Sequence, residues 1–243
     1  MRRDVLGVKI DDVNMDQALA LVETWLQPIS KAIGKKSAVK HFIVTPNPEF
    51  VVAAQRDELF RSILNDADLS IPDGIGLKFF AGFENRLAGV DFMEQMIKLS
   101  AKKGLVTGFL GGGEGVAEKC VERLRQRYQN ISVGFVDAGG EVDWDGNASK
   151  QPQIPKLDML FVGFGMVKQE KWINENLDKI PVKVAIGVGR SFDYLSGLLP
   201  RAPKVVRSLG LEWLFSLVAQ PWRIKRQLRL IKFLRLLYRI GVD

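Results

Sequence analysis

The feature that most constrains the fold is an alternation of short β-branched runs with longer amphipathic stretches through the middle of the chain. Each run is followed within a few residues by Gly, Pro or Asn, and then by a segment with helical periodicity. This order is typical of a parallel sheet whose strands are joined by crossover helices. We therefore predict strands at 39–44, 105–110, 131–136, 157–162 and 182–188, with a shorter strand ending near Ile71.

The same pattern predicts helices at 14–26, 48–65, 91–103, 114–128 and 167–177. The expected fold class is α/β, with a Rossmann-like, mostly parallel sheet and helices on both faces. Around 200–203 the sequence becomes helical, basic and aromatic, so we predict one domain over 1–200 and a helical appendage over 201–243. Open parallel sheets bind ligands at the carboxyl ends of their strands, so functional residues are expected in the turns that follow them.

The chain contains one cysteine, Cys120, and one histidine, His41. A single cysteine excludes a disulfide framework and a cysteine-based zinc site, and it indicates a reducing compartment. A single histidine excludes two-histidine metal motifs and disfavours a Ser-His-Asp or Cys-His apparatus. Two Asp-x-Asp pairs, at 66–68 and 143–145, have a spacing too common to predict a metal site, and we expect none.

The charge of the chain is concentrated in its last segment. Of 35 Lys and Arg and 28 Asp and Glu residues, ten basic and two acidic lie in 201–243, which leaves 25 and 26 for the first 200. Such an excess indicates a polyanionic partner, either nucleic acid or an anionic membrane surface. Neither a signal peptide nor a membrane-spanning apolar run is recognisable, so we expect a cytoplasmic protein that rests on a membrane.

Two turns after predicted strands carry polar side chains suited to catalysis. Thr45 and Asn47 follow the strand at 39–44, where they either cap the next helix or project into a cleft. Asp73 lies in a Pro-Asp-Gly turn, where it is either an ordinary turn residue or a lone carboxylate at the mouth of a pocket. In a chain with one histidine, an aspartate is the natural general base.

Three glycine-rich turns follow later strands, at 109–115, 163–172 and 186–193. Such turns expose backbone N–H groups at helix N-termini and suit phosphates or diphosphates. Gly111 and Gly113 match part of a dinucleotide fingerprint, but Val116 stands where its third glycine belongs. With Asp137 at the end of the next strand, an NAD-dependent oxidoreductase is therefore one alternative.

In their order along the chain, these turns resemble those of the WecG/TagA/CpsF glycosyltransferases. The resemblance covers residues 5–227 and rests on eight motifs: Thr45-Pro46-Asn47, Pro72-Asp73-Gly74-Ile75-Gly76, Arg86-Leu87-Ala88-Gly89-Val90-Asp91, Phe109-Leu110-Gly111-Gly112, Gly163-Phe164-Gly165 with Lys168-Gln169-Glu170, Phe192-Asp193, Arg201-Ala202-Pro203 and Gly210-Leu211-Glu212-Trp213. It implies an inverting, metal-independent transfer of an N-acetylmannosamine-type sugar from a UDP donor to undecaprenyl-diphosphate-linked N-acetylglucosamine. That reaction belongs to teichoic acid or surface-polysaccharide synthesis at the inner membrane face, and it needs no cofactor.

The resemblance also implies roles for individual residues. Asp73 matches the general base, and Thr45 and Asn47 lie beside it. Arg86 and Gln169 match polar residues near the donor phosphates and sugar.

Asp193 matches the position that faces the uridine. The predicted substrate-binding set also includes three residues of the glycine-rich turns, Gly111, Gly112 and Gly189. The chain departs from the family pattern at Gly139, Val167, Arg190, Ser216 and Gln220. Arg190 replaces a glycine beside the predicted uridine pocket, a change that bears on donor choice.

A helix over 222–240 is predicted to be amphipathic. Its basic face holds Lys225, Arg229, Lys232, Arg235 and Arg239, and its apolar face holds Leu230, Ile231, Phe233, Leu234, Leu237 and Tyr238, with Leu236 as a misfit. Such a helix either packs on the body with a solvated basic face or anchors the protein at a membrane interface. Arg223 and Arg226 lie off the basic face, and we predict that they reach over the cleft to bind substrate phosphates.

A nucleic-acid-binding module is the other alternative, since it would explain the basic tail. It leaves the ordered strand-end motifs without a purpose, so we expect no nucleic-acid partner. The expected partners are a UDP-activated N-acetylated sugar, a lipid-linked acceptor and an anionic membrane surface. A homo-oligomer is compatible with the sequence.

Overall fold

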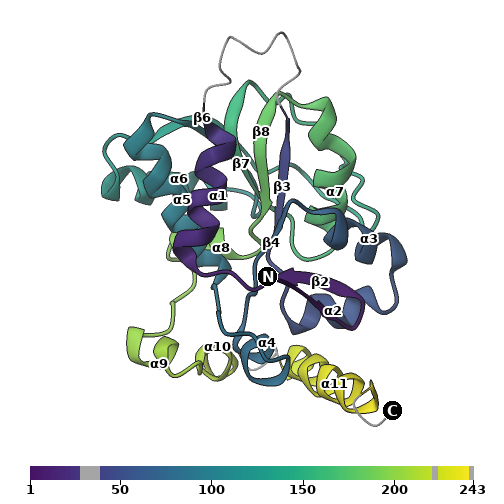
Figure 1. Ribbon diagram of the computed structural model, residues 1–243. Coiled ribbons are helices and arrows are strands. Elements are labelled where there is room, and N and C mark those ends of the chain that lie inside the picture. The colour runs from purple at the N-terminus through teal and green to yellow at the C-terminus, as the bar shows by residue number, and fades with distance from the viewer. Residues whose placement is uncertain (28–38, 221–223, 241–243) are drawn as a thin grey trace.

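The computed structural model describes residues 1–27, 39–220 and 224–240, and it has the α/β fold expected from the sequence (Figure 1). Its core is a six-stranded sheet in which all neighbouring strands are parallel. Across the sheet the order is β4 (Leu69–Ser70), β3 (His41–Val44), β8 (Val182–Gly187), β7 (Leu157–Gly163), β5 (Val106–Gly111) and β6 (Ser132–Asp137). These strands confirm the predicted ones, and the carboxyl ends of β3, β4, β7 and β8 meet at one edge.

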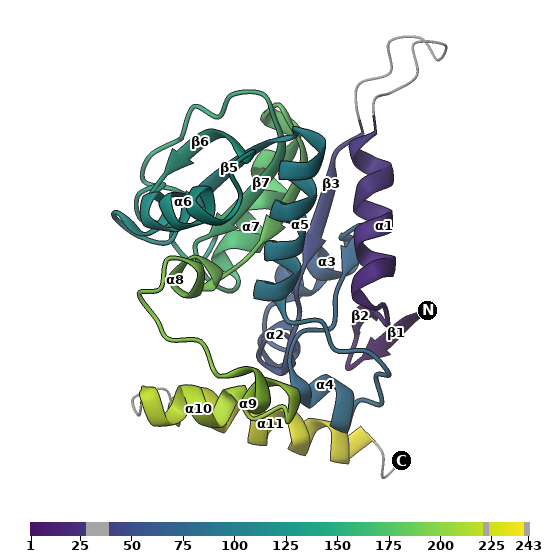
Figure 2. The same ribbon diagram turned by 90° about the vertical axis from the view of Figure 1, so that its left-hand side faces the viewer.

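Helices cover both faces of the sheet. One face carries α1 (Met15–Leu26), α5 (Gly89–Lys103), α6 (Val116–Arg127) and α8 (Ser191–Leu195) (Figure 2). The other carries α2 (Pro48–Ala54), α3 (Glu58–Asp66), α7 (Lys168–Asn176) and the 3-10 helix η1 (Leu177–Lys179). Successive strand residues point to opposite faces of the sheet. Ile43 is therefore buried under α1, α5, α6 and α8, whereas Phe42 and Val44 are buried on the face that carries α2, α3 and α7.

Two features near the N-terminus differ from the prediction. The strands β1 (Arg2–Val5) and β2 (Val8–Asp11) form an antiparallel hairpin that the sequence pattern did not reveal. Its two-residue turn places both Leu6 and Gly7 at positive φ, and the first of these is an unusual residue for that conformation. The single helix predicted at 48–65 is instead the pair α2 and α3, because the Asp57 side chain accepts a hydrogen bond from Phe60 N at 2.9 Å and starts a new helix.

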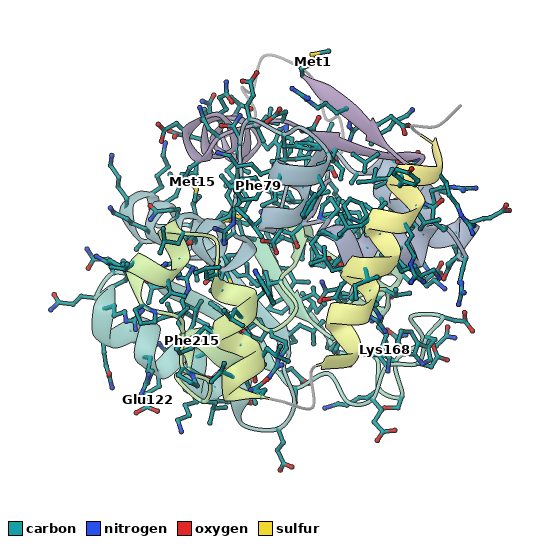
Figure 3. The ribbon with its side chains drawn as sticks, turned by 90° about the horizontal axis from the view of Figure 1, so that it is seen from below. Met1, Met15, Phe79, Glu122, Lys168 and Phe215 are labelled. Carbon is teal, nitrogen blue, oxygen red and sulfur yellow. The ribbon has the colours of Figure 1, made fainter. Side chains whose placement is uncertain are left out.

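The remaining helices gather below the carboxyl ends of the strands (Figure 1). They are α4 (Ile75–Phe80), α9 (Lys204–Ser208), α10 (Glu212–Ala219) and α11 (Ile224–Ile240), and α11 packs against α2 and α4 (Figure 3). The apolar face of α11 is turned inward, with Phe233 fully buried in the core beneath α2. The structure therefore shows that α11 packs on the body, and it leaves the predicted contact with a membrane as a prediction.

The detailed face assignment on α11 was partly wrong. Ile231 and Tyr238 are exposed, whereas Leu236 packs on the core. At about 100° per residue, Leu236 lies about 60° around the helix from Phe233, but Ile231 and Tyr238 lie about 160° and 140° away. The body covers only the stripe centred on Phe233.

Several large apolar side chains remain exposed on these same helices and at their ends. We call them the exposed apolar set: Phe79, Phe80, Val205, Leu209, Trp213, Leu214, Val218, Ile231 and Tyr238. Within the part of the chain that the structure describes, no helix is both long enough and apolar enough to cross a membrane.

Candidate functional site

A cavity of about 550 Å³ lies at the carboxyl ends of the central strands. We call it the main cavity. The turns after β3, β4, β7 and β8 form one side of it, and residues of α10 and α11 form another. Five of the predicted site residues line it: Thr45, Asn47, Asp73, Gln169 and Gly189. Residues that are up to 144 positions apart in the chain therefore meet at the strand ends, as predicted.

Asp73 follows β4 and lies deep in the wall of the main cavity. Its backbone N–H donates to the carbonyl of Pro46 at 2.9 Å, and its carboxylate accepts from the backbone N–H groups of Gly74 and Gly89. Burial raises the pKa of Asp73 to about 6, and the nearby Glu212 adds to this rise while Arg86 opposes it. The carboxylate is therefore largely ionised at neutral pH and has a pKa suited to accepting a proton.

Thr45 and Asn47 hold the turn opposite Asp73. The Asn47 side chain accepts from Glu49 N at 2.8 Å and from Phe50 N at 3.3 Å, so it caps α2 as well as lining the cavity. Thr45 is buried, and its hydroxyl donates to the carbonyl of Gly187 at 3.4 Å. Asn47 therefore both caps the next helix and faces the cavity, so the two predictions for it are met by one conformation.

Gln169 joins the turns after β7 and β8. Its Oε1 accepts from Gly165 N at 3.2 Å and from Gly189 N at 2.9 Å, and its Nε2 donates to Glu170 at 2.6 Å. Glu170 is fully buried and also accepts from Val167 N at 2.7 Å. Burial raises the pKa of Glu170 to about 7, although these hydrogen bonds oppose the rise. The pair fixes the relative position of two walls of the main cavity.

A second cavity of about 330 Å³ opens beside the glycine turns. We call it the glycine cavity; its lining includes Gly112, Gly113, Gly189, Arg190 and Asp193. The amides of Gly112 and Gly189 already donate within the protein, to Gly163 O and Gln169 Oε1. These glycines therefore contribute space rather than free N–H groups, which corrects the expectation from the turn pattern.

Gly111 lines neither cavity. Its φ is +99°, and a Cβ there would lie 2.8 Å from the carbonyl carbon of Gly163, so only glycine allows β5 and β7 to approach at this point. Gly139, where the family resemblance implied an aromatic residue, is similarly constrained, because a Cβ would lie 2.4 Å from the Phe164 ring. Phe164 itself lines both cavities and supplies an aromatic ring there.

Asp193 is held by Arg190. The guanidinium Nε donates to Asp193 Oδ2 at 3.2 Å, and the Nη1 of the same side chain donates to Gln220 Oε1 at 3.2 Å. Arg190 and Gln220 are two of the departures from the family pattern, and the structure shows that they contact each other. Together they tie the turn before α8 to the end of α10.

Arg86 lines neither the main cavity nor the glycine cavity. It lines a third cavity of about 370 Å³, the arginine cavity, with Ala88, Asp91, Lys204, Arg207 and Glu212. An ion pair with Glu212 and a hydrogen bond to the carbonyl of Arg207 at 3.1 Å hold it there. The ion-pair partner lies 126 residues away in the sequence, so local pattern could not reveal this position. Arg223 and the side chain of Arg226 lie outside the described residues.

The main cavity is also lined by Trp144 and Lys168, neither of which was predicted from the sequence as a site residue. The Lys168 ammonium lies 5.4 Å from the centre of the Trp144 ring and donates to Val142 O at 2.5 Å. Trp144 was read only as the middle of an Asp-x-Asp pair. Asp143 instead folds the loop, since it accepts from the backbone N–H groups of Asp145 and Asn147, each at 2.9 Å.

Comparison with known proteins finds one matching family and relatives that share one name. The family described as Glycosyl transferase WecG/TagA/CpsF matches residues 3–242. A protein of Staphylococcus aureus (strain MRSA252) is 31% identical over 229 residues, which cover 92% of this chain and 87% of the relative. One of Bacillus subtilis (strain 168) is 34% identical over 197 residues, covering 79% and 76%. Both are named N-acetylglucosaminyldiphosphoundecaprenol N-acetyl-beta-D-mannosaminyltransferase.

Proposed function

Because the chain belongs to the WecG/TagA/CpsF family of glycosyltransferases, we propose that it transfers an N-acetylmannosamine-type sugar from UDP to undecaprenyl-diphosphate-linked N-acetylglucosamine. The observation that carries the proposal is the position of Asp73, a carboxylate with a raised pKa in the wall of a cavity at the strand ends. The names of the relatives support this acceptor and this sugar. The product serves the synthesis of teichoic acid or a related surface polysaccharide.

In this mechanism Asp73 accepts the proton of the acceptor hydroxyl while the hydroxyl oxygen bonds to the anomeric carbon of the donor sugar. The bond from that carbon to the diphosphate oxygen breaks on the opposite face, and its electron pair leaves with UDP. Attack and departure on opposite faces invert the anomeric configuration. A positioned general base of this kind contributes about 10²–10⁴-fold to the rate.

The donor nucleotide occupies the glycine cavity, and its sugar extends into the main cavity. These two cavities share Lys168 and Arg190, so both cations lie where a departing diphosphate would develop charge. Asp193, fixed by Arg190, faces the nucleoside. Arg223 and Arg226 remain predicted contacts to the phosphates, in addition to the cations that the structure describes.

This assignment predicts activity without a divalent metal. With UDP-N-acetylmannosamine and a lipid-linked acceptor, the rate of radiolabel transfer should stay the same in excess EDTA, because protein cations neutralise the leaving group. UDP should raise the melting temperature of the protein, and NAD should not. Loss of transfer in EDTA with recovery on adding Mg²⁺ or Mn²⁺ would contradict the metal-free mechanism.

The protein is proposed to bind peripherally to the inner face of the membrane. The exposed apolar set lies on the helices below the main cavity, and α11 adds the exposed cations Arg235 and Arg239. Apolar side chains with nearby basic residues favour an anionic interface. A lipid-linked acceptor would then reach the cavity without leaving the bilayer.

A double substitution on α10 tests this membrane face. Leu214→Asp with Val218→Asp should weaken sedimentation with anionic vesicles about tenfold or more, because two side chains that would enter the interface become charged. Leu59→Asp, at an exposed position of α3, is the control and should leave vesicle binding unchanged. Equal vesicle binding by wild type and the double variant would show that α10 does not meet the membrane.

A further inference from the structure

The main cavity adjoins the other two cavities and shares different lining residues with each of them. On one side, the main cavity shares Lys168, Gly189 and Arg190 with the glycine cavity. On another side, it shares Ala88 and Glu212 with the arginine cavity. The proposed donor occupies the glycine cavity and the main cavity, so the arginine cavity on the other side has no ligand assigned to it.

The arginine cavity is rich in positive charge. Its walls carry Arg86, Lys204 and Arg207 against Asp91 and Glu212. A further cation, Arg201, reaches Asp91 Oδ2 at 2.7 Å, while Arg207 reaches Asp91 Oδ1 at 3.4 Å. Four cations thus surround two carboxylates, which leaves an excess positive charge in a partly enclosed space.

Hydrogen-bond donors are also in excess here. The Nε atoms of Arg86, Arg201 and Arg207 are buried and have no acceptor among the described residues. Leaving a buried donor unpaired is costly, so a cluster of such donors calls for an explanation. Lys204 is exposed at the cavity wall and forms no ion pair within the described parts of the chain. Fixed guanidinium groups and a free ammonium together suit a phosphate-type anion.

We propose that the arginine cavity binds the diphosphate of the acceptor, separately from the diphosphate of the donor. This inference rests on the proposed function, in which the acceptor is a sugar diphosphate on a lipid. The acceptor hydroxyl must reach Asp73, so the diphosphate at the other end of the same sugar lies about one ring away. Arg86 is close enough to Asp73 to lower its pKa and also lines the arginine cavity.

The surroundings of the arginine cavity fit a lipid-linked diphosphate. Lys204 and Arg207 lie on α9, and Leu209 directly after this helix is exposed at 63%. Val205, in the same helix, is exposed at 69%, and α4 and α10 add further members of the exposed apolar set, among them Phe79 on α4 (Figure 3). A polyprenyl chain attached to a diphosphate in this cavity would emerge onto these apolar side chains. The two diphosphates would then be held by different cations, which limits their mutual repulsion.

The site can be tested directly with inorganic pyrophosphate at saturating UDP, so that the donor site is filled. Isothermal titration should show a second, pyrophosphate-binding event in the wild type. Lys204→Gln should weaken it about tenfold, the loss expected for one charge-assisted contact. Lys98→Gln, a substitution of an exposed lysine on α5 outside all three cavities, should not.

Kinetics provide the second arm. With a short-chain N-acetylglucosaminyl diphosphate as acceptor, Lys204→Gln and Arg207→Gln should raise the acceptor KM about tenfold each and leave the donor KM unchanged. With an alkyl N-acetylglucosaminide that lacks phosphate, wild type and variants should have equal KM values. Arg207→Lys should restore part of the loss.

The outcomes separate this inference from the proposed function. Transfer activity with no pyrophosphate binding at saturating UDP would overturn the acceptor site and leave the glycosyltransferase intact. A rise in the donor KM instead of the acceptor KM would overturn it as well. If no transfer occurs with any donor, the proposed function fails, while the pyrophosphate titration of wild type and Lys204→Gln still decides whether the cavity binds a diphosphate. Lys204 is exposed and forms no ion pair with the residues that the structure describes, so its substitution should not compromise folding.

Discussion

Asp73→Asn is expected to lower kcat by about 10²-fold or more while leaving UDP binding unchanged, because the variant keeps the shape of the side chain but cannot accept a proton. Steady-state transfer assays and a UDP titration measure the two effects separately. In the wild type, activity should fall as the pH drops through about 6, the raised pKa of Asp73. Turnover near the wild-type rate would remove Asp73 from the role of general base.

The same substitution should stabilise the fold at neutral pH. The folded pKa of Asp73 is about 6, above its ordinary value of 3.8, so the stability linked to its neutral form is present below pH 3.8 and lost as the pH rises through 6. Asparagine stays neutral, so the variant should gain on the order of 3 kcal/mol above pH 7 and nothing below pH 4. Asp66→Asn, at the exposed end of α3, is the matched control for the same change of side chain.

Phe233→Ala should have the largest effect on stability. The ring of Phe233 is fully buried in the core next to α2, and truncating a buried Phe costs about 3–5 kcal/mol. Since Arg229 on the same helix lines the main cavity and its Nη1 donates to Glu49 at 3.2 Å, loosening α11 should also weaken substrate binding.

Denaturant unfolding and hydrogen exchange of the α11 amides measure this effect. Ile231→Ala removes a side chain that is 49% exposed on the same helix, and it should change the free energy of unfolding by less than about 1 kcal/mol. Equal losses for the two substitutions would show that α11 is not anchored through Phe233.

Much of the fold could be predicted because its signals are local. Each of the six sheet strands is a short β-branched run, and a glycine or proline turn follows it within a few consecutive residues. The hairpin of β1 and β2 was missed because Leu6 adopts a positive φ that residue type does not suggest. The division between α2 and α3 depends on one hydrogen bond from Phe60 N to Asp57, which periodicity cannot show.

The site was predictable to the extent that strand ends define it. Thr45, Asn47 and Asp73 line the main cavity because parallel strands end at a common edge. Arg86 could not be placed in this way, since its position depends on Glu212 far along the chain. Gly111, the first glycine of the partial nucleotide fingerprint, is required by its close packing against Gly163.

The packing of α11 on α2 has a consequence for biosynthesis. About 170 residues separate the end of α2 at Ala54 from the start of α11 at Ile224. At about 5–20 residues per second, a ribosome needs roughly 10–30 seconds to make that intervening chain. The last sheet strand, β8, ends at Gly187, so late in this interval the nascent protein has its sheet but still lacks the helix that covers α2 and completes the wall of the main cavity. The growing chain therefore carries an uncovered apolar surface, a natural target for chaperones, and its cavity is completed only after α11 has emerged and docked.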